Sequence, residues 1–324
     1  MSAVPLSLTP LIGRSDELAA LCSLLESNRL LTLTGAGGSG KTRLAAEVAV
    51  RSVEGFSDGV LWIELAPLGD PDLLPTYLLD VLGLEPGARP AMTALMDSLR
   101  EREALMVLDN CEHLVEACAA LVSILLRGCP HVRVLATSRE ALGVNGERAW
   151  LVPGLALPPS DVAPVADIAE SSAVKLFVER AQGALASFHL TTANAGAIAH
   201  ICRRLDGLPL AIELAAARVR TLPPEELATR LDDALRVLGA GARTATSRHR
   251  TLRETVDWSY RLLDEREKTL LQRLSMFAGD FTLNAAESVG ADVDLDAADV
   301  LDIIGALVAK SLIVMRESEG TARY

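Results

Sequence analysis

A glycine-rich segment that ends in lysine and threonine carries the residue types most suited to chemistry. Residues 35–42 read Gly-Ala-Gly-Gly-Ser-Gly-Lys-Thr, which matches the phosphate-loop pattern G-x-x-x-x-G-K-[ST]. Glycines allow backbone N–H groups to turn inward around a phosphate, and a following helix adds partial positive charge. We expect Lys41 to reach the β- and γ-phosphates of a nucleotide, and Thr42 to offer its hydroxyl to Mg²⁺. The segment therefore predicts a phosphate site.

The residues around this loop predict a strand before it and a helix after it. The apolar run Leu30–Leu33 precedes the loop, and the helix-forming stretch Leu44–Val53 follows it. The glycine spacing also satisfies the dinucleotide fingerprint, which requires an acidic residue about 20 positions later. Glu54 lies near that distance but comes before the next strand, and Lys41 and Thr42 have no role in that interpretation. A phosphate loop is thus favoured over a dinucleotide site and over a structural glycine turn without a ligand.

Two further strands are followed by charged side chains. Ala104–Asp109 is an apolar strand that ends in a carboxylate, and we expect Asp109 to hold the Mg²⁺ shell. The alternative is an acidic residue in an ordinary solvated turn. His131–Thr137 is the next strand, and Arg139 lies just beyond its carboxyl end, where open α/β sheets bind ligands. We expect Arg139 to point toward a γ-phosphate, the alternative being a solvated arginine.

The composition is that of a globular chain rich in aliphatic residues. Its 324 residues are 50% hydrophobic but only 3% aromatic, which favours two or three domains built largely from helices. The net charge of −12 argues against a main role in nucleic-acid contact, because such binding neutralises phosphates. The five cysteines are scattered, which is typical of reduced thiols rather than a disulfide framework. With no signal peptide and no long apolar run, we expect a cytoplasmic protein.

Proline-rich and glycine-rich segments divide the rest of the chain. Prolines at 153, 158, 159 and 164 predict one boundary, and the segment Gly239–Arg250 predicts a second. The end of the chain predicts short helices and a β-hairpin whose strands are Ser311–Met315 and a second from Thr321, so we expect the native protein to continue past Tyr324. A further strand is expected at 59–65, and helices are expected at 15–28, 72–82, 91–101, from 110, 172–183, 192–205, 209–219, 224–238 and 264–276.

Five motifs occur along the chain in a characteristic order and spacing. They are Ile12-Gly13-Arg14, the phosphate loop, Leu105–Asn110, Thr137-Ser138-Arg139 and Gly207–Ala211. Together they resemble the NB-ARC domain of the STAND class of signal-transduction ATPases. Longer segments are similar to the bacterial subgroup that forms the centre of SARP-type and LuxR-type transcriptional regulators. Those segments are Leu108–His113, Ala136–Glu140 and Arg253–Tyr260.

This resemblance implies a fold and a division into domains. The fold would be an α/β P-loop NTPase with a parallel sheet in three layers, followed by an α-helical subdomain and a winged-helix subdomain. The implied boundaries are a linker at 1–10, the P-loop domain at 11–155, the helical subdomain at 156–240 and the winged helix at 241–324, truncated at its hairpin.

The resemblance also implies an adenine nucleotide, ATP or ADP, bound with Mg²⁺. Ile12 and Arg14 would border the adenine, and Pro209 would pack beside the base. Thr42 and Asp109 would hold the metal, and Lys41, Asp109 and Arg139 would be the catalytic residues. The full set of implied nucleotide-binding residues is Ile12, Gly13, Arg14, Gly35, Ala36, Gly37, Gly38, Ser39, Gly40, Lys41, Thr42, Arg43 and Pro209.

The chain departs from the family pattern at two places. Many P-loop ATPases place a second acidic residue directly after the strand carboxylate, whereas this chain has Asn110. An amide orients water but does not accept its proton, so turnover should be slow unless Glu112 or another residue substitutes. A histidine that locks the ADP state in relatives would lie beyond Tyr324.

We therefore expect a nucleotide-controlled switch that self-associates in the ATP state and acts on effector and sensor domains outside this chain, with no membrane partner. One alternative is a turnover ATPase or kinase with its own substrate. Another is a winged helix that binds DNA directly, against which the acidic residues near the C-terminus argue. Those residues are Glu287, Asp292, Asp294, Asp296 and Asp299.

Overall fold

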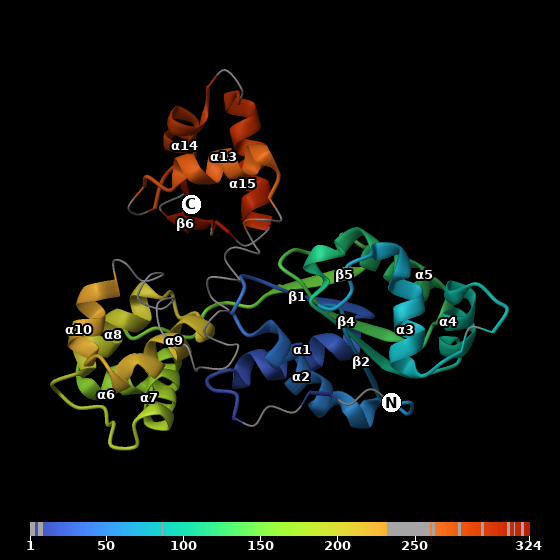
Figure 1. Cartoon of the computed structure of the whole chain (residues 1–324), viewed down its shortest axis with the longest axis horizontal. Coiled ribbons are helices and arrows are strands. Elements are labelled where there is room, and N and C mark those ends of the chain that lie inside the picture. The colour runs from blue at the N-terminus through green and yellow to red at the C-terminus, as the bar shows by residue number, and fades with distance from the viewer. Residues whose placement is uncertain are drawn as a thin grey trace.

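A parallel β-sheet forms the centre of the first half of the chain. The computed structural model describes residues 4–5, 9–85, 87–231, 260, 263–277, 280–292, 295–309, 312–313, 315–318 and 321–324. Within these residues the sheet has five strands in the order β2-β3-β4-β1-β5, and every neighbouring pair is parallel (Figure 1). The strands are β1 Leu30–Thr34, β2 Val60–Glu64, β3 Leu105–Asp109, β4 Arg133–Thr137 and β5 Glu147–Leu151. The predicted parallel α/β fold is confirmed.

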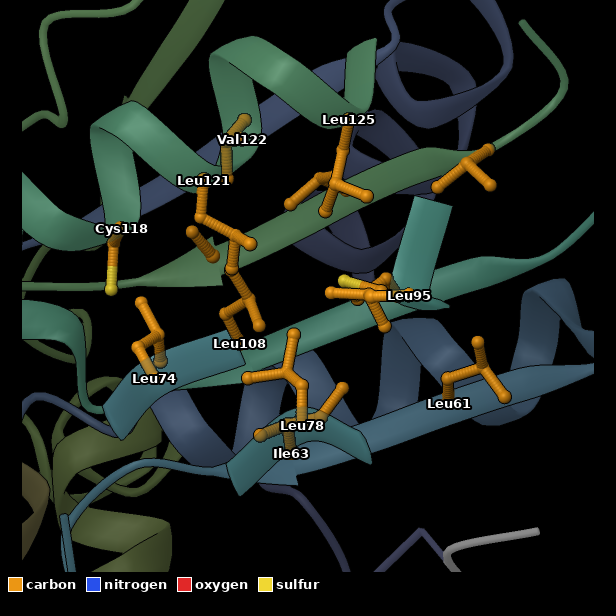
Figure 2. Close-up of a cluster of buried hydrophobic side chains, with 14 of the residues drawn as sticks. Leu61, Ile63, Leu74, Leu78, Leu95, Leu108, Cys118, Leu121, Val122 and Leu125 are labelled. Atoms are coloured by element: carbon orange, nitrogen blue, oxygen red, sulfur yellow. The ribbon is translucent and has the colours of Figure 1, made fainter. Parts of the chain in front are cut away.

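Helices cover both faces of this sheet because alternate strand residues point to opposite sides. In β2, Leu61 and Ile63 face one hydrophobic cluster, whereas Val60 and Trp62 face the other. Figure 2 shows the first cluster, in which Leu78 and the residues around it fill the space between sheet and helices. Its helices are α3 Leu74–Leu82, α4 Ala91–Leu99 and α5 Val115–Gly128, and those of the other face are α1 Ser15–Ser27 and α2 Lys41–Ser52.

The edge strand β5 was not among the predicted strands. Its five residues are intermediate or exposed, and Leu151 keeps 64% of its surface accessible. As an edge strand, β5 pairs only with β1, and its side chains are not covered as those of a central strand are. It therefore lacks the apolar run that identifies a buried parallel strand. Residues 152–164 continue from β5 to the next helices.

Five helices and a short 3₁₀ turn follow, around a hydrophobic cluster of their own. Phe177 is completely buried there, with its ring centroid 6.2 Å from that of Phe188. The predicted helices of this region are confirmed, but α6 was not predicted, and α10 is described only to Arg230. The elements are α6 Val165–Glu170, α7 Ser172–Ala184, α8 Ala195–Arg204, α9 Pro209–Ala216, the turn Ala217–Arg220 and α10 Pro224–Arg230.

The last described part combines three helices with an antiparallel hairpin. Asp264 caps the first helix by accepting from the N–H of Glu267, whose side chain accepts from the N–H of Asp264 in return. The expected second hairpin strand does begin at Thr321, but the first begins at Arg316 rather than at Ser311. The elements are α13 Glu265–Leu274, α14 Leu283–Gly290, α15 Ala297–Ala309, β6 Arg316–Ser318 and β7 Thr321–Arg323.

The difference at the first hairpin strand has a packing cause. Leu312 and Ile313, within the expected strand, pack against the local hydrophobic cluster, and the N–H of Leu312 donates to the carbonyl of Leu307. The boundary Gly239–Arg250 and the motif residues 253–259 lie outside the described residues. Of the helices in the described ranges, none combines the length and the apolar character needed to cross a bilayer.

Candidate nucleotide-binding site

The phosphate loop joins β1 to α2 and depends on its glycines. Gly38 and Gly40 have φ values of 81° and 94°, in the left-handed region that side chains disfavour. A Cβ atom on Gly38 would also lie only 2.8 Å from the Cβ atom of Leu210. A residue with a Cβ atom would be strained at either position, so the backbone path of the loop requires glycine at 38 and 40.

Lys41 is folded back over this loop. Its Nζ donates to the carbonyl oxygens of Gly35 at 2.7 Å and of Ala36 at 3.1 Å. Burial lowers the pKa of Lys41 from 10.5 to about 8, and the Arg139 charge adds to that lowering while Glu112 and Asp109 oppose it. A phosphate at the loop would favour the charged ammonium, so nucleotide binding and protonation of Lys41 are linked.

The loop also presents a polar group whose hydrogen-bonding capacity is unused. Ser39 is 2% exposed, and its hydroxyl has no hydrogen-bond partner among the described residues. An unpartnered hydroxyl in a buried loop costs free energy that a phosphate oxygen would offset. Together with the left-handed glycines, this orphaned donor fits a phosphate-binding loop.

Asp109 ends β3 and accepts two short hydrogen bonds. Thr42 donates to its Oδ1 at 2.8 Å and Thr137 donates to the same atom at 2.6 Å. Burial raises the pKa of Asp109, and these two hydrogen bonds oppose the increase. A hydroxyl and a carboxylate this close form the oxygen ligand set that Mg²⁺ prefers, so the residues fit the predicted metal.

Thr137 was not predicted to belong to the site. Strand β4 lies between β1 and β3, and its register aligns Ala136 with Leu108 of β3, so Thr137 and Asp109 are the next residues along the two strands. This places the Thr137 hydroxyl beside Asp109, where it also accepts from the backbone N–H of Asn110 at 2.9 Å. Thr137 is the first residue of the motif Thr137-Ser138-Arg139, which was noted without a role for the threonine, and that motif is the signal that could have revealed it.

Asn110 follows Asp109 in the left-handed region, with φ of 67°. Asparagine tolerates this conformation better than most residues. Its side-chain Nδ2 lies 3.4 Å from Nδ1 of His113, whose Nε2 lies 2.8 Å from the carbonyl oxygen of Leu68. Because that carbonyl can only accept, we assign the proton to Nε2, which leaves Nδ1 to accept from Asn110.

Arg139 and Glu112 form a buried ion pair. Nε of Arg139 lies 3.3 Å from Oε1 of Glu112, and the two side chains are only 6% and 9% exposed. Glu112 belongs to the 3₁₀ turn Cys111–His113 after β3, and Arg139 follows β4. The arginine predicted to sense a γ-phosphate is therefore held by a carboxylate in this structure.

These side chains face one cavity of about 690 Å³. Several residues that no sequence argument placed in the nucleotide site join the wall, among them Glu213 and Leu210 of α9. Asp109 lies behind the wall, hydrogen-bonded to Thr42. The predicted nucleotide-binding and catalytic residues that the structure brings to this wall are Gly37, Gly38, Gly40, Lys41, Thr42, Arg43, Arg139 and Pro209.

The structure places the N-terminal motif at a junction beside the cavity. The guanidinium of Arg14, 3% exposed, donates to Glu17 at 2.9 Å, to the carbonyl of Ser39 at 3.3 Å and to the carbonyl of Pro153 at 2.6 Å. Ile12 packs against the helical cluster, and Gly13 would bring a Cβ atom into the side chain of Ser172. The contact of Ile12 and Arg14 with an adenine stays a prediction.

Helix α9 reaches the phosphate loop directly. The N–H of Leu210 donates to the carbonyl of Gly38 at 3.2 Å, and the Arg43 guanidinium lies 3.6 Å from the Glu213 carboxylate. Gly207, at φ of 66° directly before this helix, packs against the segment that follows β5, since a Cβ atom there would lie 2.3 Å from the carbonyl oxygen of Leu155. The helical part and the loop are therefore joined at the base of α9.

Comparison with known proteins agrees with this geometry. Residues 25–143 match the family described as AAA domain. The chain is 45% identical over 304 residues to Rv0890c of Mycobacterium tuberculosis, which is provisionally named an HTH-type transcriptional regulator. That match covers 93% of this chain but 33% of the relative, so the chain spans about a third of the regulator's length.

A second relative is matched over most of its length. The uncharacterized protein Rv0894 of Mycobacterium tuberculosis is 41% identical over 320 residues, which are 98% of this chain and 78% of Rv0894. Among solved structures, the Walker-type ATPase PABY2304 of Pyrococcus abyssi shares the fold, with a TM-score of 0.59 at 14% identity over 98% of this chain and 95% of that one. The chain therefore belongs to the same family as Rv0894, and its first half is a P-loop NTPase domain of the AAA type.

Proposed function

We propose that this chain is an adenine-nucleotide switch of the STAND class, related to NB-ARC domains, within a bacterial transcriptional regulator. The observation that carries the proposal is the contact between α9 and the phosphate loop. Leu210 donates to the carbonyl of Gly38, so the backbone that would surround the phosphates also holds the helical part. The provisional name of Rv0890c supports the regulatory role.

A switch requires that a ligand bind its two arrangements with different affinity. Here the source of that difference is the γ-phosphate, which Lys41 and Arg139 would recognise. In the ADP state, the loop, the helical part and the last part of the chain would form one closed arrangement. In the ATP state, rearrangement around Arg139 would favour an open form that self-associates or acts on effector domains outside this chain.

The proposed hydrolysis is slow. Asn110 follows Asp109 where many P-loop ATPases have a second carboxylate, and an amide does not accept the proton of water, so fast turnover would need a carboxylate elsewhere in the site, such as Glu112. Mg²⁺, held by Thr42 and Asp109, would neutralise charge on the phosphates. We also propose that residues 241–324 are a winged helix that closes over the nucleotide, which the three helices and the antiparallel hairpin of the described part support.

The test is to purify the chain without added nucleotide, denature it and identify the released small molecules by chromatography. Stoichiometric ADP is the expected result and would correspond to a closed, slowly exchanging switch. An empty protein that hydrolyses added ATP steadily at about 1 per second or faster, the low end of ordinary enzyme turnover, would favour a turnover ATPase instead.

A further inference from the structure

The ion pair between Glu112 and Arg139 occupies the carboxyl end of the sheet, where its two residues come from adjacent strands. Strand β3 pairs with β4, so the turn after β3 and the residues after β4 lie next to each other. The sequence separates them by 27 residues, and each strand end carries a different element of the site. The pair is thus built by the topology of the sheet rather than by local sequence.

Several contacts fix the position of Glu112. Cys111, directly before it, is completely buried, and its carbonyl accepts from the N–H of Leu114 at 2.9 Å. His113, directly after it, lies 2.8 Å from the carbonyl oxygen of Leu68 through Nε2. Glu112 therefore projects from a short turn that is anchored on both sides, and its side chain joins the cavity wall.

A buried ion pair is not explained by stability alone. Removing two charges from water costs several kcal/mol per ion, and the mutual attraction often only offsets this cost. In this chain the charges face the cavity that also contains Lys41 and Thr42, and the Glu112 charge acts on the Lys41 ammonium.

The same cavity lacks a base at the residue next to Asp109. Asn110 presents an amide there, and Asp109 itself accepts from Thr42 and Thr137. Of the described residues that form the cavity wall, the two with carboxylates are Glu112 and Glu213. Glu213 belongs to α9 and pairs with Arg43 and Arg180, away from the strand ends.

We propose that Glu112 is the carboxylate that accepts the proton of the attacking water, and that Arg139 restrains it until a γ-phosphate competes for the guanidinium. This inference rests on the proposed nucleotide switch. With ADP, which has no γ-phosphate, Arg139 keeps the Glu112 carboxylate engaged. With ATP, the γ-phosphate oxygens attract Arg139. The Glu112 carboxylate is then free to accept a proton from the water that attacks the γ-phosphorus.

The chemical step balances without any further reactant. The water oxygen forms a bond to the γ-phosphorus while its proton passes to Glu112 Oε. The bond between the γ-phosphorus and the oxygen that bridges it to the β-phosphate breaks, and that oxygen leaves with the electron pair as ADP. Glu112 then returns its proton to solvent with the inorganic phosphate, and Arg139 pairs with the carboxylate again.

The experiment compares Glu112→Gln with the wild-type chain. The amide keeps the shape and an oxygen that can accept from Arg139, but it does not take a proton. We expect single-turnover hydrolysis of bound ATP to fall about 100-fold or more, the range for loss of a general base. We also expect tight ATP binding to persist, so that the nucleotide retained after incubation with ATP and gel filtration changes from ADP to ATP.

The matched control is Glu116→Gln, four residues further on, in the first turn of α5 and exposed to solvent. It should hydrolyse ATP at the wild-type rate. Hydrolysis by Glu112→Gln at the wild-type rate with ATP bound would overturn the proposal, as would an equal loss in the control. Asn110→Ala with a greater loss than Glu112→Gln would also overturn it, by assigning the water to the amide.

If Glu112→Gln does not fold, the pair Arg139→Gln and Arg139→Gln/Glu112→Gln replaces it, because the double variant leaves no unpaired charge. The double variant must then be slower than Arg139→Gln alone by the same factor of about 100, and equal rates would refute the role of Glu112. Failure of the proposed function is distinguishable, since it would appear as a wild-type chain that binds neither ADP nor ATP.

Discussion

Replacing Thr137 by valine tests whether the Asp109 carboxylate is tuned for Mg²⁺. The substitution keeps the shape of a side chain that is 1% exposed but removes the hydroxyl that donates to Asp109 at 2.6 Å. A hydrogen bond to a charged group contributes about 1.5–3 kcal/mol. Burial already raises the pKa of Asp109, so loss of the hydrogen bond from Thr137 should raise that pKa further. The affinity of the site for Mg²⁺ should then fall by about 10- to 100-fold.

The assay is titration of a fluorescent ADP analogue at fixed Mg²⁺ and again with EDTA. The variant should lose affinity mainly when Mg²⁺ is present. The ionised Asp109 is the form that binds metal, so the affinity is lost as the pH falls through the raised pKa, and the variant should lose it at higher pH than the wild type. The backbone N–H of Asn110, which donates to Thr137 at 2.9 Å, loses its partner as well, so a lower melting temperature is expected.

The chain offers a matched control in Thr32→Val. Thr32 is completely buried in β1, and its hydroxyl has no hydrogen-bond partner among the described residues. The same loss of a hydroxyl there should leave the Mg²⁺ dependence unchanged and the stability equal or higher. An unchanged Mg²⁺ dependence in Thr137→Val, or an equal loss in Thr32→Val, would refute the role assigned to the Thr137 hydroxyl.

Three further predictions concern the loop and the sensing arginine. With a Lys41 pKa of about 8, nucleotide binding above pH 8 should take up a proton, so the affinity there should fall by up to about tenfold for each pH unit. Calorimetry in two buffers of different ionisation enthalpy measures this proton uptake, and Lys41→Arg should abolish it. Gly38→Ala should weaken ADP binding and lower the melting temperature more than Gly143→Ala does, because a Cβ atom on Gly38 also meets Leu210. Gly143, with φ of 73° and no atom within 4 Å, has only the backbone cost of about 1–2 kcal/mol. Equal effects of the two substitutions in binding and melting assays would disprove the close packing. Arg139→Ala should keep ADP affinity but lose the difference between ADP and ATP, and competition titrations that show an unchanged ratio would contradict its role.

The phosphate loop was predictable because the residues that would bind the phosphates are consecutive in the sequence. Residues 35–42 and the strand that precedes them form a local pattern, and Asp109 ends an apolar run that any parallel sheet would bury. The same apolar runs predicted a buried parallel sheet, and the family resemblance implied its three layers. These features need no knowledge of which strands are neighbours.

The rest of the site depends on neighbours that the sequence does not state. The insertion of β4 between β1 and β3 brings Thr137 to Asp109 and Arg139 to Glu112, and no local spacing indicates that order. The edge strand β5 escaped prediction because its residues are exposed, so its pairing with β1 leaves no hydrophobic signature. The Arg14 guanidinium also bridges the carbonyls of Ser39 and Pro153, a contact that no sequence pattern indicated, and the proximity of this N-terminal motif to the base stays a prediction.

The separation of the hydrophobic clusters has a consequence for how the chain unfolds. Two clusters share the sheet, while the helical part and the last part have cores of their own. Polar contacts such as Leu210 to Gly38 join the helical part to the sheet, so each unit can melt with limited cost to the others. A nucleotide that touches both the loop and α9 would couple these units, and separate calorimetric transitions should then merge into one at a higher temperature as ADP is added.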